Sequence, residues 1–215
     1  MNKKGDLTAE ELLGLILIII VLGLVGALIF QGFQGGENKS KETFLRVLND
    51  AETLEPGAKG SSLLFLDAET ALVYFEPEAD NVTVDVDVTL TPRDLQVVFK
   101  KPNTCDNTKG CVCLFQENTY EDTGGTIGDL QGTVTPTKSS CRETEKYFSM
   151  ANCAVGVAEG VDSYTCHNGF VIERLVIDKA RDEVKVINTD AHYVAPSRIA
   201  LQLQREGNTV TVSVQ

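Results

Sequence analysis

The feature that most constrains this 215-residue chain is an apolar run at residues 12–30, LLGLILIIIVLGLVGALIF. Its nineteen residues carry no charge and no hydrogen-bonding side chain, and the nearest charges are Glu11 and Glu37. As a helix the run would span roughly 28 Å, close to the thickness of the hydrocarbon core of a bilayer. A helix also satisfies its own backbone hydrogen bonds in lipid. The run therefore predicts a membrane-spanning helix.

The residues on either side of the run indicate its orientation. Lys3 and Lys4 precede it, whereas Glu37 opens the far side. Because positive flanking charge stays cytoplasmic, we expect the N-terminus inside and residues 37–215 outside. A cleaved secretory peptide is the alternative, but the run exceeds the usual apolar region and no A-x-A-type site follows it. The pattern favours a single-pass membrane protein with an exported C-terminal domain.

A short motif lies directly before the apolar run. Lys3-Lys4-Gly5 is followed by Asp6-Leu7-Thr8-Ala9-Glu10. This resembles the class III signal peptide of archaeal type IV pilin-like proteins, where a basic pair and Gly precede the cut and Gln-x-Ser-x-Glu opens the mature chain. Here Asp6 and Thr8 stand in place of Gln and Ser. The resemblance covers about 30 of the 215 residues.

The resemblance implies processing and assembly roles for three residues. A prepilin-peptidase-like membrane protease would cut between Gly5 and Asp6, which makes residues 1–5 a leader peptide. Glu10 would become the fifth mature residue, whose carboxylate neutralises the N-terminal amine of a neighbouring subunit and so sets the register between subunits. A local role is the alternative, in which the acids before the run cap a helix and favour its positive end.

A second helix is expected beyond the membrane segment. Residues 6–36 would comprise the transmembrane and assembly helix with a Gly-rich joint, because each glycine weakens a helix by about 1 kcal/mol relative to Ala. Residues 37–57 predict an amphipathic stalk helix that ends at Pro56-Gly57. Packing of this helix against its own head would explain its apolar face. That face consists of Phe44, Leu45, Val47, Leu48, Ala51 and Leu54.

Residues 58–215 change to a period of two, which predicts a β-rich head. Residues 63–66 and 72–75 flank a polar turn and are expected to form a hairpin. The overall expectation is an α+β fold, with a long N-terminal membrane and stalk helix followed by a disulfide-stapled, sandwich-like antiparallel head. Further strands are expected at 82–90, 95–99, 170–177 (a central strand), 184–187, and in a closing hairpin of 199–204 with 209–214.

All six cysteines lie in a Cys-rich region at residues 101–168. An even number on the exported side suggests three structural disulfides, with fifteen possible pairings. Two cysteines at i and i+2 of one strand project in parallel, so Cys111 and Cys113 are poor partners. Zinc or a redox pair is the alternative, but C-x₂-C knuckles and a C-x-x-C motif are lacking. We expect no metal ion and no cofactor. The cysteines are Cys105, Cys111, Cys113, Cys141, Cys153 and Cys166.

Charge and modification motifs describe the exterior of the head. The formal net charge of −12 argues against nucleic acid and anionic lipid headgroups as partners. Two sequons, at Asn38 and Asn81, are possible glycosylation sites on the exported side, and Asn81 is the better candidate. Asp85 and Asp87 could suggest calcium, but alternate strand residues simply face solvent and no calcium-binding loop follows.

Catalysis finds little support in the sequence. The two histidines, His167 and His192, lie in unrelated contexts, and neither a Gly-x-Ser-x-Gly elbow nor a phosphate-binding Gly-Lys-Thr/Ser occurs. We therefore expect no enzyme. The hypothesis is a structural subunit of a pilin-like surface filament, a homo-oligomer packed through its N-terminal helix. The alternative is a monomeric membrane-anchored binding or sensor module, or a pseudopilin-like component.

Overall fold

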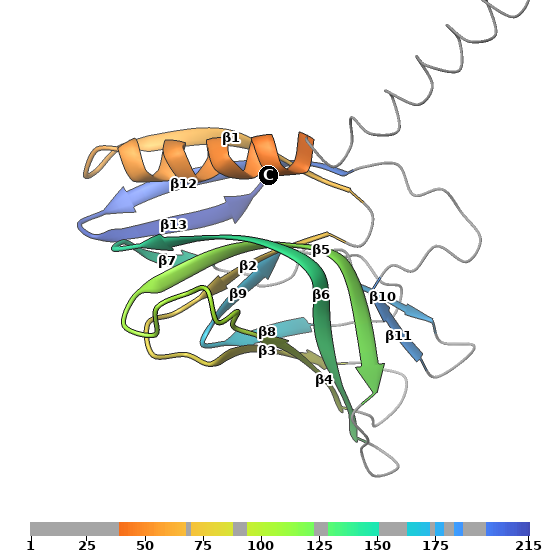
Figure 1. Ribbon diagram of the computed structural model, residues 1–215. Helices are drawn as coiled ribbons and strands as arrows, with labels where there is room; N and C mark the ends of the chain where they lie inside the picture. Colours follow the sequence, from red (N-terminus) through yellow and green to blue (C-terminus); the bar gives the residue numbers. More distant parts are fainter. Residues whose placement is uncertain are drawn as a thin grey trace, which may run out of the picture. The chain divides into compact units, whose positions relative to one another are not determined.

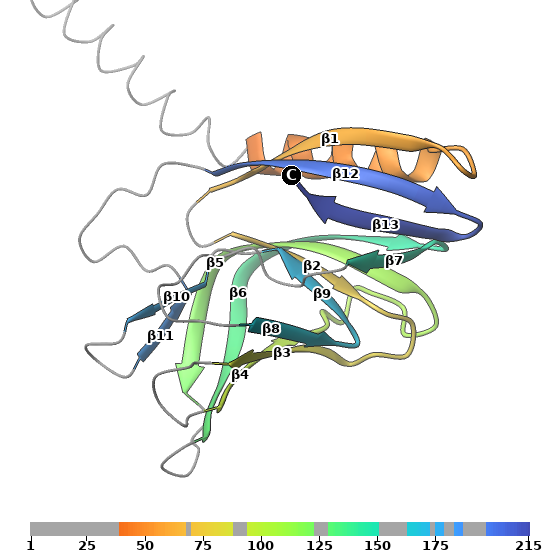
Figure 2. The same ribbon diagram turned by 180° about the vertical axis from the view of Figure 1, so that it is seen from behind.

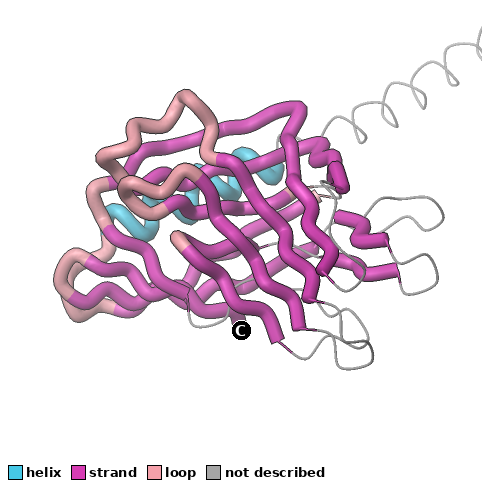
Figure 3. The backbone as a smooth tube through the Cα atoms, turned by 90° about the horizontal axis from the view of Figure 1, so that it is seen from below, coloured by secondary structure: helices cyan, strands magenta, loops and turns pink. Residues whose placement is uncertain are grey.

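The computed structural model describes residues 39–67, 70–87, 94–122, 129–150, 163–172, 175–178, 183–186 and 197–215. Contacts between Cα atoms divide the chain into two units, Met1–Lys39 and Ser40–Gln215. The described residues of the second unit hold thirteen strands, and a helix is described at residues 39–53 (Figure 3). The alternating segments 82–87, 199–204 and 209–214 lie in three of these strands, because successive side chains of a strand point to opposite faces.

Four strands form the smaller main sheet, in the order β1-β12-β13-β7. The first three pair antiparallel, and β13 pairs parallel with β7 (Figure 1). Gly207, with a φ of 61°, lies in the tight turn between β12 and β13. The bounds are β1 (Lys59–Leu66), β7 (Tyr147–Met150), β12 (Ser197–Glu206) and β13 (Thr209–Val214).

Seven strands form the larger sheet, in the order β8-β3-β4-β6-β5-β2-β9. Its longest members, β5 and β6, run side by side and bend strongly (Figure 1). The strands at the two ends of the order are consecutive in the chain, with only Asn168 between them, so the ends of the sheet meet (Figure 2). The bounds are β2 (Ala71–Phe75), β3 (Asn81–Asp87), β4 (Asp94–Lys100), β5 (Gly110–Asp122), β6 (Asp129–Thr144), β8 (Ser163–His167) and β9 (Gly169–Ile172). A separate hairpin joins β10 (Leu175–Asp178) to β11 (Glu183–Val186).

The helix at residues 39–53 lies along β1 and covers the edge of that strand (Figure 1). The backbone N–H of Phe65 donates to Thr43 Oγ1 at 3.0 Å. Arg46 Nη2 donates to the backbone oxygen of Leu63 at 3.4 Å. These bonds occupy backbone groups on a strand that would otherwise end the sheet with an open edge, where another chain could pair.

Two cations hold the C-terminal end of the same helix. Lys146 Nζ donates to the backbone oxygen of Ala51 at 3.0 Å, and Arg205 Nη1 donates to that of Leu54 at 2.7 Å. Cations at this position complement the negative end of the helix dipole and satisfy carbonyls that lack helical partners. Burial lowers the pKa of Lys146, and the nearby Arg205 charge lowers it further.

Apolar side chains from both main sheets and from the helix form one core. Tyr74 of β2 lies within this core. Its ring centroid is 5.4 Å from that of Phe148 of β7 and 5.4 Å from that of Phe170 of β9. Because β7 belongs to the smaller main sheet, the contact of Tyr74 with Phe148 joins the two sheets. Burial raises the pKa of Tyr74, and the nearby Glu76 charge raises it further.

The structure corrects the expected fold class. The described residues form a β-rich domain with one short helix, whose apolar face is buried in the core. In this part of the chain, no helix has the length and apolar character to cross a membrane, and the run at 12–30 lies outside it. The sheets are not purely antiparallel either, because β4 and β6, like β13 and β7, run parallel.

Several individual strand predictions can also be compared with the structure. The strand at 95–99 and the closing hairpin are confirmed as β4 and β12–β13, and β3 confirms the described part of 82–90. The hairpin of 63–66 with 72–75 is wrong, because β1 and β2 belong to different sheets. The single central strand at 170–177 is also wrong: it is split into β9, at one end of its sheet, and β10.

Candidate functional site

Four cysteines from three segments meet at one place on the larger sheet. Cys111 and Cys113 lie two residues apart on β5, so their side chains share a face of the strand. Cys141 of β6 is directly opposite Cys113 in the antiparallel register. Cys105 comes from the turn before β5, where its backbone N–H donates to the oxygen of Pro102 at 3.0 Å. Strand pairing thus brings together cysteines that are up to 36 positions apart in the sequence.

The four cysteines form two disulfides, Cys105–Cys111 and Cys113–Cys141. This confirms that disulfides are present and that Cys111 and Cys113 do not pair with each other. Cys166 of β8 is also disulfide-bonded, and no free cysteine occurs among the described residues. Cys153 lies outside those residues. Each closed loop restricts the unfolded chain, which stabilises a domain by roughly 2–4 kcal/mol for a typical bridge.

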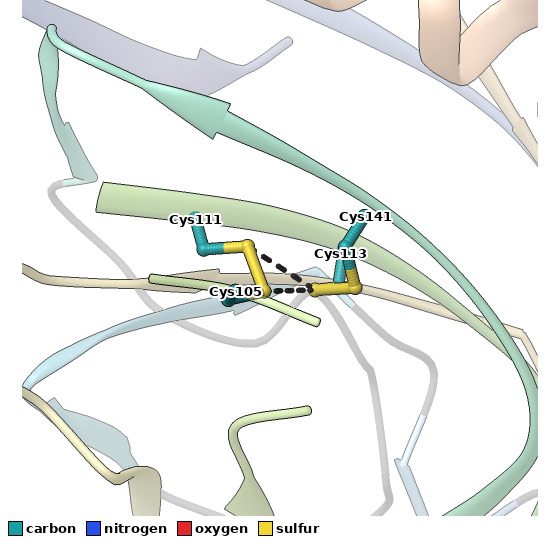
Figure 4. Close-up of side chains that lie close together, drawn as sticks. All are labelled: Cys105, Cys111, Cys113 and Cys141. Carbon is teal, nitrogen blue, oxygen red and sulfur yellow. Dashed lines mark hydrogen bonds between the residues drawn. A yellow bond between two sulfur atoms is a disulfide. The ribbon is translucent and has the colours of Figure 1, made fainter. Parts of the chain in front are cut away.

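The two disulfides are in contact with each other (Figure 4). The sulfur of Cys113 lies 3.7 Å from that of Cys105 and 3.8 Å from that of Cys111. These are van der Waals contacts and not hydrogen bonds, because a disulfide sulfur carries no hydrogen. All four sulfurs lie within 4.8 Å of one another. Three of the cysteines are buried, and Cys141 is partly exposed. We call these four residues the cysteine cluster.

The turn that carries Cys105 is attached to β6 by charged groups. The backbone N–H of Asp106 donates to Glu143 Oε1 at 2.9 Å, and Lys109 Nζ lies 3.6 Å from Glu143 Oε2. Asp106 in turn accepts hydrogen bonds from the backbone N–H and hydroxyl of Thr108, which lower the pKa of the Asp106 carboxyl. The turn therefore keeps its position beside the strands by interactions other than the disulfide.

The other predicted site residues fall in two groups. Gly5, Asp6, Glu10 and Asn38 lie outside the described residues. Asn81 is the first residue of β3 and is half-buried, with its Oδ1 accepting from Thr83 Oγ1 at 3.4 Å. The Thr83 hydroxyl and the Asn81 side-chain amide of this sequon therefore lie side by side.

A polar group on β3 was not found from the sequence. Asp85 Oδ2 lies 2.9 Å from His167 Nε2 of β8, and Asp85 Oδ1 accepts from Gln96 Nε2 of β4 at 2.9 Å. The alternation of β3 predicts that Asp85 points away from the core, but its partners depend on the pairing of three strands. The carboxylate that was considered as a calcium ligand thus has two side-chain partners.

The convergence of the cysteine cluster was also missed. Paired C-x₂-C knuckles are recognised by spacing along the chain, whereas the cluster arises across the β5–β6 ladder. The i, i+2 spacing that places Cys111 and Cys113 on one face of a strand was the only local signal for it. No protein-family model, no curated protein and no solved structure matches this chain.

Proposed function

We propose that this chain is a structural subunit of a pilin-like surface filament, held in the membrane by its apolar segment before assembly. The observation that carries the proposal is the order of residues 3–10, a basic pair and Gly followed by an acid, directly before the uncharged run at 12–30. Cleavage after Gly5 would leave a free amine at Asp6 and a carboxylate at Glu10, near the start of an apolar segment.

The properties of the head support an exported role. The cysteines of the described part are all oxidised to disulfides, which persist mainly outside the reducing cytosol. The unit Ser40–Gln215 has its own core, which is what an exported domain needs in order to fold. Its helix covers the edge of β1, which protects the head against uncontrolled strand pairing between subunits at high local concentration.

Charge pairing would set the register of the filament. When apolar segments of several subunits pack together, an unpaired carboxylate surrounded by them costs several kcal/mol. The new amine at Asp6 of a neighbouring subunit is the counter-charge that removes this cost from Glu10. The Glu10 carboxylate meets the Asp6 amine of its neighbour only at one axial offset between subunits. The charge pair that lowers the cost therefore also fixes this offset in the filament.

The test compares Glu10→Gln with Glu11→Gln in the native host. Electron microscopy of sheared surface material should show filaments for the parent chain and for Glu11→Gln, and none for Glu10→Gln. Glu11 is the matched control because it lies about 100° around a helix from Glu10. Mass spectrometry of the mature parent chain should give Asp6 as the first residue.

Three outcomes would contradict the proposal. An intact Met1 on correctly localised protein would exclude processing after Gly5. Normal filaments from Glu10→Gln would exclude its role in register. A full-length chain that remains a monomer in mild detergent, with no filaments from any variant, would favour the membrane-anchored binding or sensor module.

A further inference from the structure

The cysteine cluster has the composition of a thiolate metal site, and its four sulfurs lie within 4.8 Å of one another. We propose that, after reduction of its two disulfides, the cluster binds one thiophilic divalent cation, Zn²⁺, through Cys105, Cys111, Cys113 and Cys141. The inference is independent of the proposed filament function, because it rests on four sulfur positions within the head.

The two contacts of the Cys113 sulfur with the other disulfide have the sulfur–sulfur spacing of a tetrahedral thiolate site, whereas the two bonded pairs are closer. Zinc–sulfur bonds are about 2.3 Å long, so two ligands of a tetrahedron lie about 3.8 Å apart. The contacts of Cys113 with Cys105 and Cys111 are 3.7 and 3.8 Å, and no sulfur of the four lies more than 4.8 Å from another. Only the two bonded pairs must separate, and each side chain can do so by rotation about its Cα–Cβ bond.

The backbone around the cluster remains supported without the disulfides. Cys113 and Cys141 face each other within an antiparallel ladder that runs from Gly110–Thr144 to Asp122–Gly132. Apolar neighbours on β5, Val112 and Leu114, are buried in the core. The turn of Cys105 is also attached to Glu143 through the backbone N–H of Asp106. Reduced ligands would therefore stay near their positions, which lowers the ordering cost of metal binding.

The chemistry requires four electrons from a reductant. Two molecules of a dithiol reduce the two disulfides, each donating two electrons and two protons and becoming a cyclic disulfide itself. The four resulting Cys thiols then bind Zn²⁺ as thiolates and release four protons. Metal binding should thus strengthen as pH rises, because the thiols must be deprotonated. Reoxidation would restore the disulfides and expel the ion, so disulfides and metal are alternative cross-links of the same strands.

The test uses the full chain in mild detergent, with Co²⁺ as the spectroscopic probe. After reduction with a phosphine and removal of the reductant under anaerobic conditions, titration should give one equivalent of bound Co²⁺ with the visible bands of tetrahedral thiolate coordination. Addition of Zn²⁺ should abolish those bands. The oxidised chain should bind none. Cys113→Ser should lose the bands, because Cys113 contacts two of the other ligands.

Cys166→Ser is the matched control, since it also removes a cysteine that is disulfide-bonded but lies on β8, outside the cluster. It should retain one equivalent of cobalt. Circular dichroism is recorded throughout. A reduced chain that keeps its strand signal without cobalt bands overturns the proposal. A reduced chain that loses its strand signal and does not regain it with metal also overturns the proposal. Equal cobalt spectra for Cys113→Ser and Cys166→Ser overturn it as well. A negative cobalt result does not bear on filament formation, because cobalt spectra and electron microscopy of filaments are separate measurements.

Discussion

A single glycine allows β9 to approach β2 closely in the larger sheet. Gly169, the first residue of β9, has a φ of +147°, and a Cβ there would overlap the backbone oxygen of Tyr74 and lie 2.8 Å from Val82 Cγ2. Gly169→Ala should therefore lower the free energy of unfolding by about 3 kcal/mol or more, as measured by urea denaturation.

Gly207→Ala is the matched control for this change. It also has a positive φ, +61°, but no atom lies within 4 Å of its added Cβ. Its free energy of unfolding should fall only by the cost of placing an L-residue at positive φ, about 1–2 kcal/mol. Equal losses for the two variants would show that the contact with Tyr74 does not limit this position.

The buried tyrosine predicts a dependence of stability on alkaline pH. Burial raises the folded-state pKa of Tyr74 above its ordinary value of 10.0. A raised folded pKa contributes stability that is present below the unfolded pKa and is lost as pH rises through the folded pKa. Tyr74→Phe keeps the ring contacts and removes the titration, so its stability should fall less above pH 10 than that of the parent chain.

Urea denaturation on either side of pH 10 checks this expectation. Tyr147→Phe, which changes a tyrosine of β7 that is 52% exposed, should follow the parent chain. A parallel decline of Tyr74→Phe and the parent would contradict the assignment of the alkaline transition to Tyr74.

Among the elements, the helix at residues 39–53 stabilises a strand edge through side-chain hydrogen bonds. Thr43 Oγ1 accepts from Phe65 N and also donates to the backbone oxygen of Ser40 at 3.1 Å, in a buried position. Thr43→Val conserves shape and removes these bonds, leaving a buried N–H without its acceptor. The free energy of unfolding should fall by about 1–3 kcal/mol.

Thr53→Val supplies the control on the same helix. Thr53 Oγ1 donates to the oxygen of Asn49 at 2.8 Å in an exposed position, where water can replace the bond. The free energy of unfolding of Thr53→Val should differ from that of the parent chain by no more than about 0.5 kcal/mol. If Thr43→Val were equally mild by urea denaturation, the hydrogen bond at the edge of β1 would not contribute to stability.

For the whole molecule, the described disulfides and the core have separate roles. Cys113–Cys141 links neighbouring strands of one sheet, and Cys105–Cys111 links a turn to one of them, so neither bridge joins the two main sheets. The sheets are joined by apolar contacts, including those of Tyr74 with Phe148.

Reduction should therefore loosen the molecule locally. In the absence of metal, hydrogen exchange measured by mass spectrometry should become moderately faster at residues 101–115 and 139–144, with the β5–β6 ladder still formed, while β12 and β13 keep their protection. A uniform rise across the head would instead show that the disulfides, and not the apolar core, hold the sheets together.

The sequence by itself determined the local states of much of the head. Alternation at 82–87 and 209–214 predicted strands, and the apolar spacing from Phe44 to Leu54 predicted a helix, because side-chain direction has a fixed period along each kind of backbone. An even cysteine number likewise predicted disulfides. These properties depend on neighbours within a few residues.

The tertiary structure alone decided which strands pair and which side chains meet. Residues 63–66 and 72–75 are adjacent in sequence but lie in different sheets, because β1 pairs with β12, more than a hundred residues away, and β2 pairs with β5 and β9. The cysteine cluster and the contact of Asp85 with His167 arise in the same way, from register across strands. Strand pairing is set by burial of a shared core, and that free energy belongs to the folded chain as a whole, whereas period and composition belong to short segments.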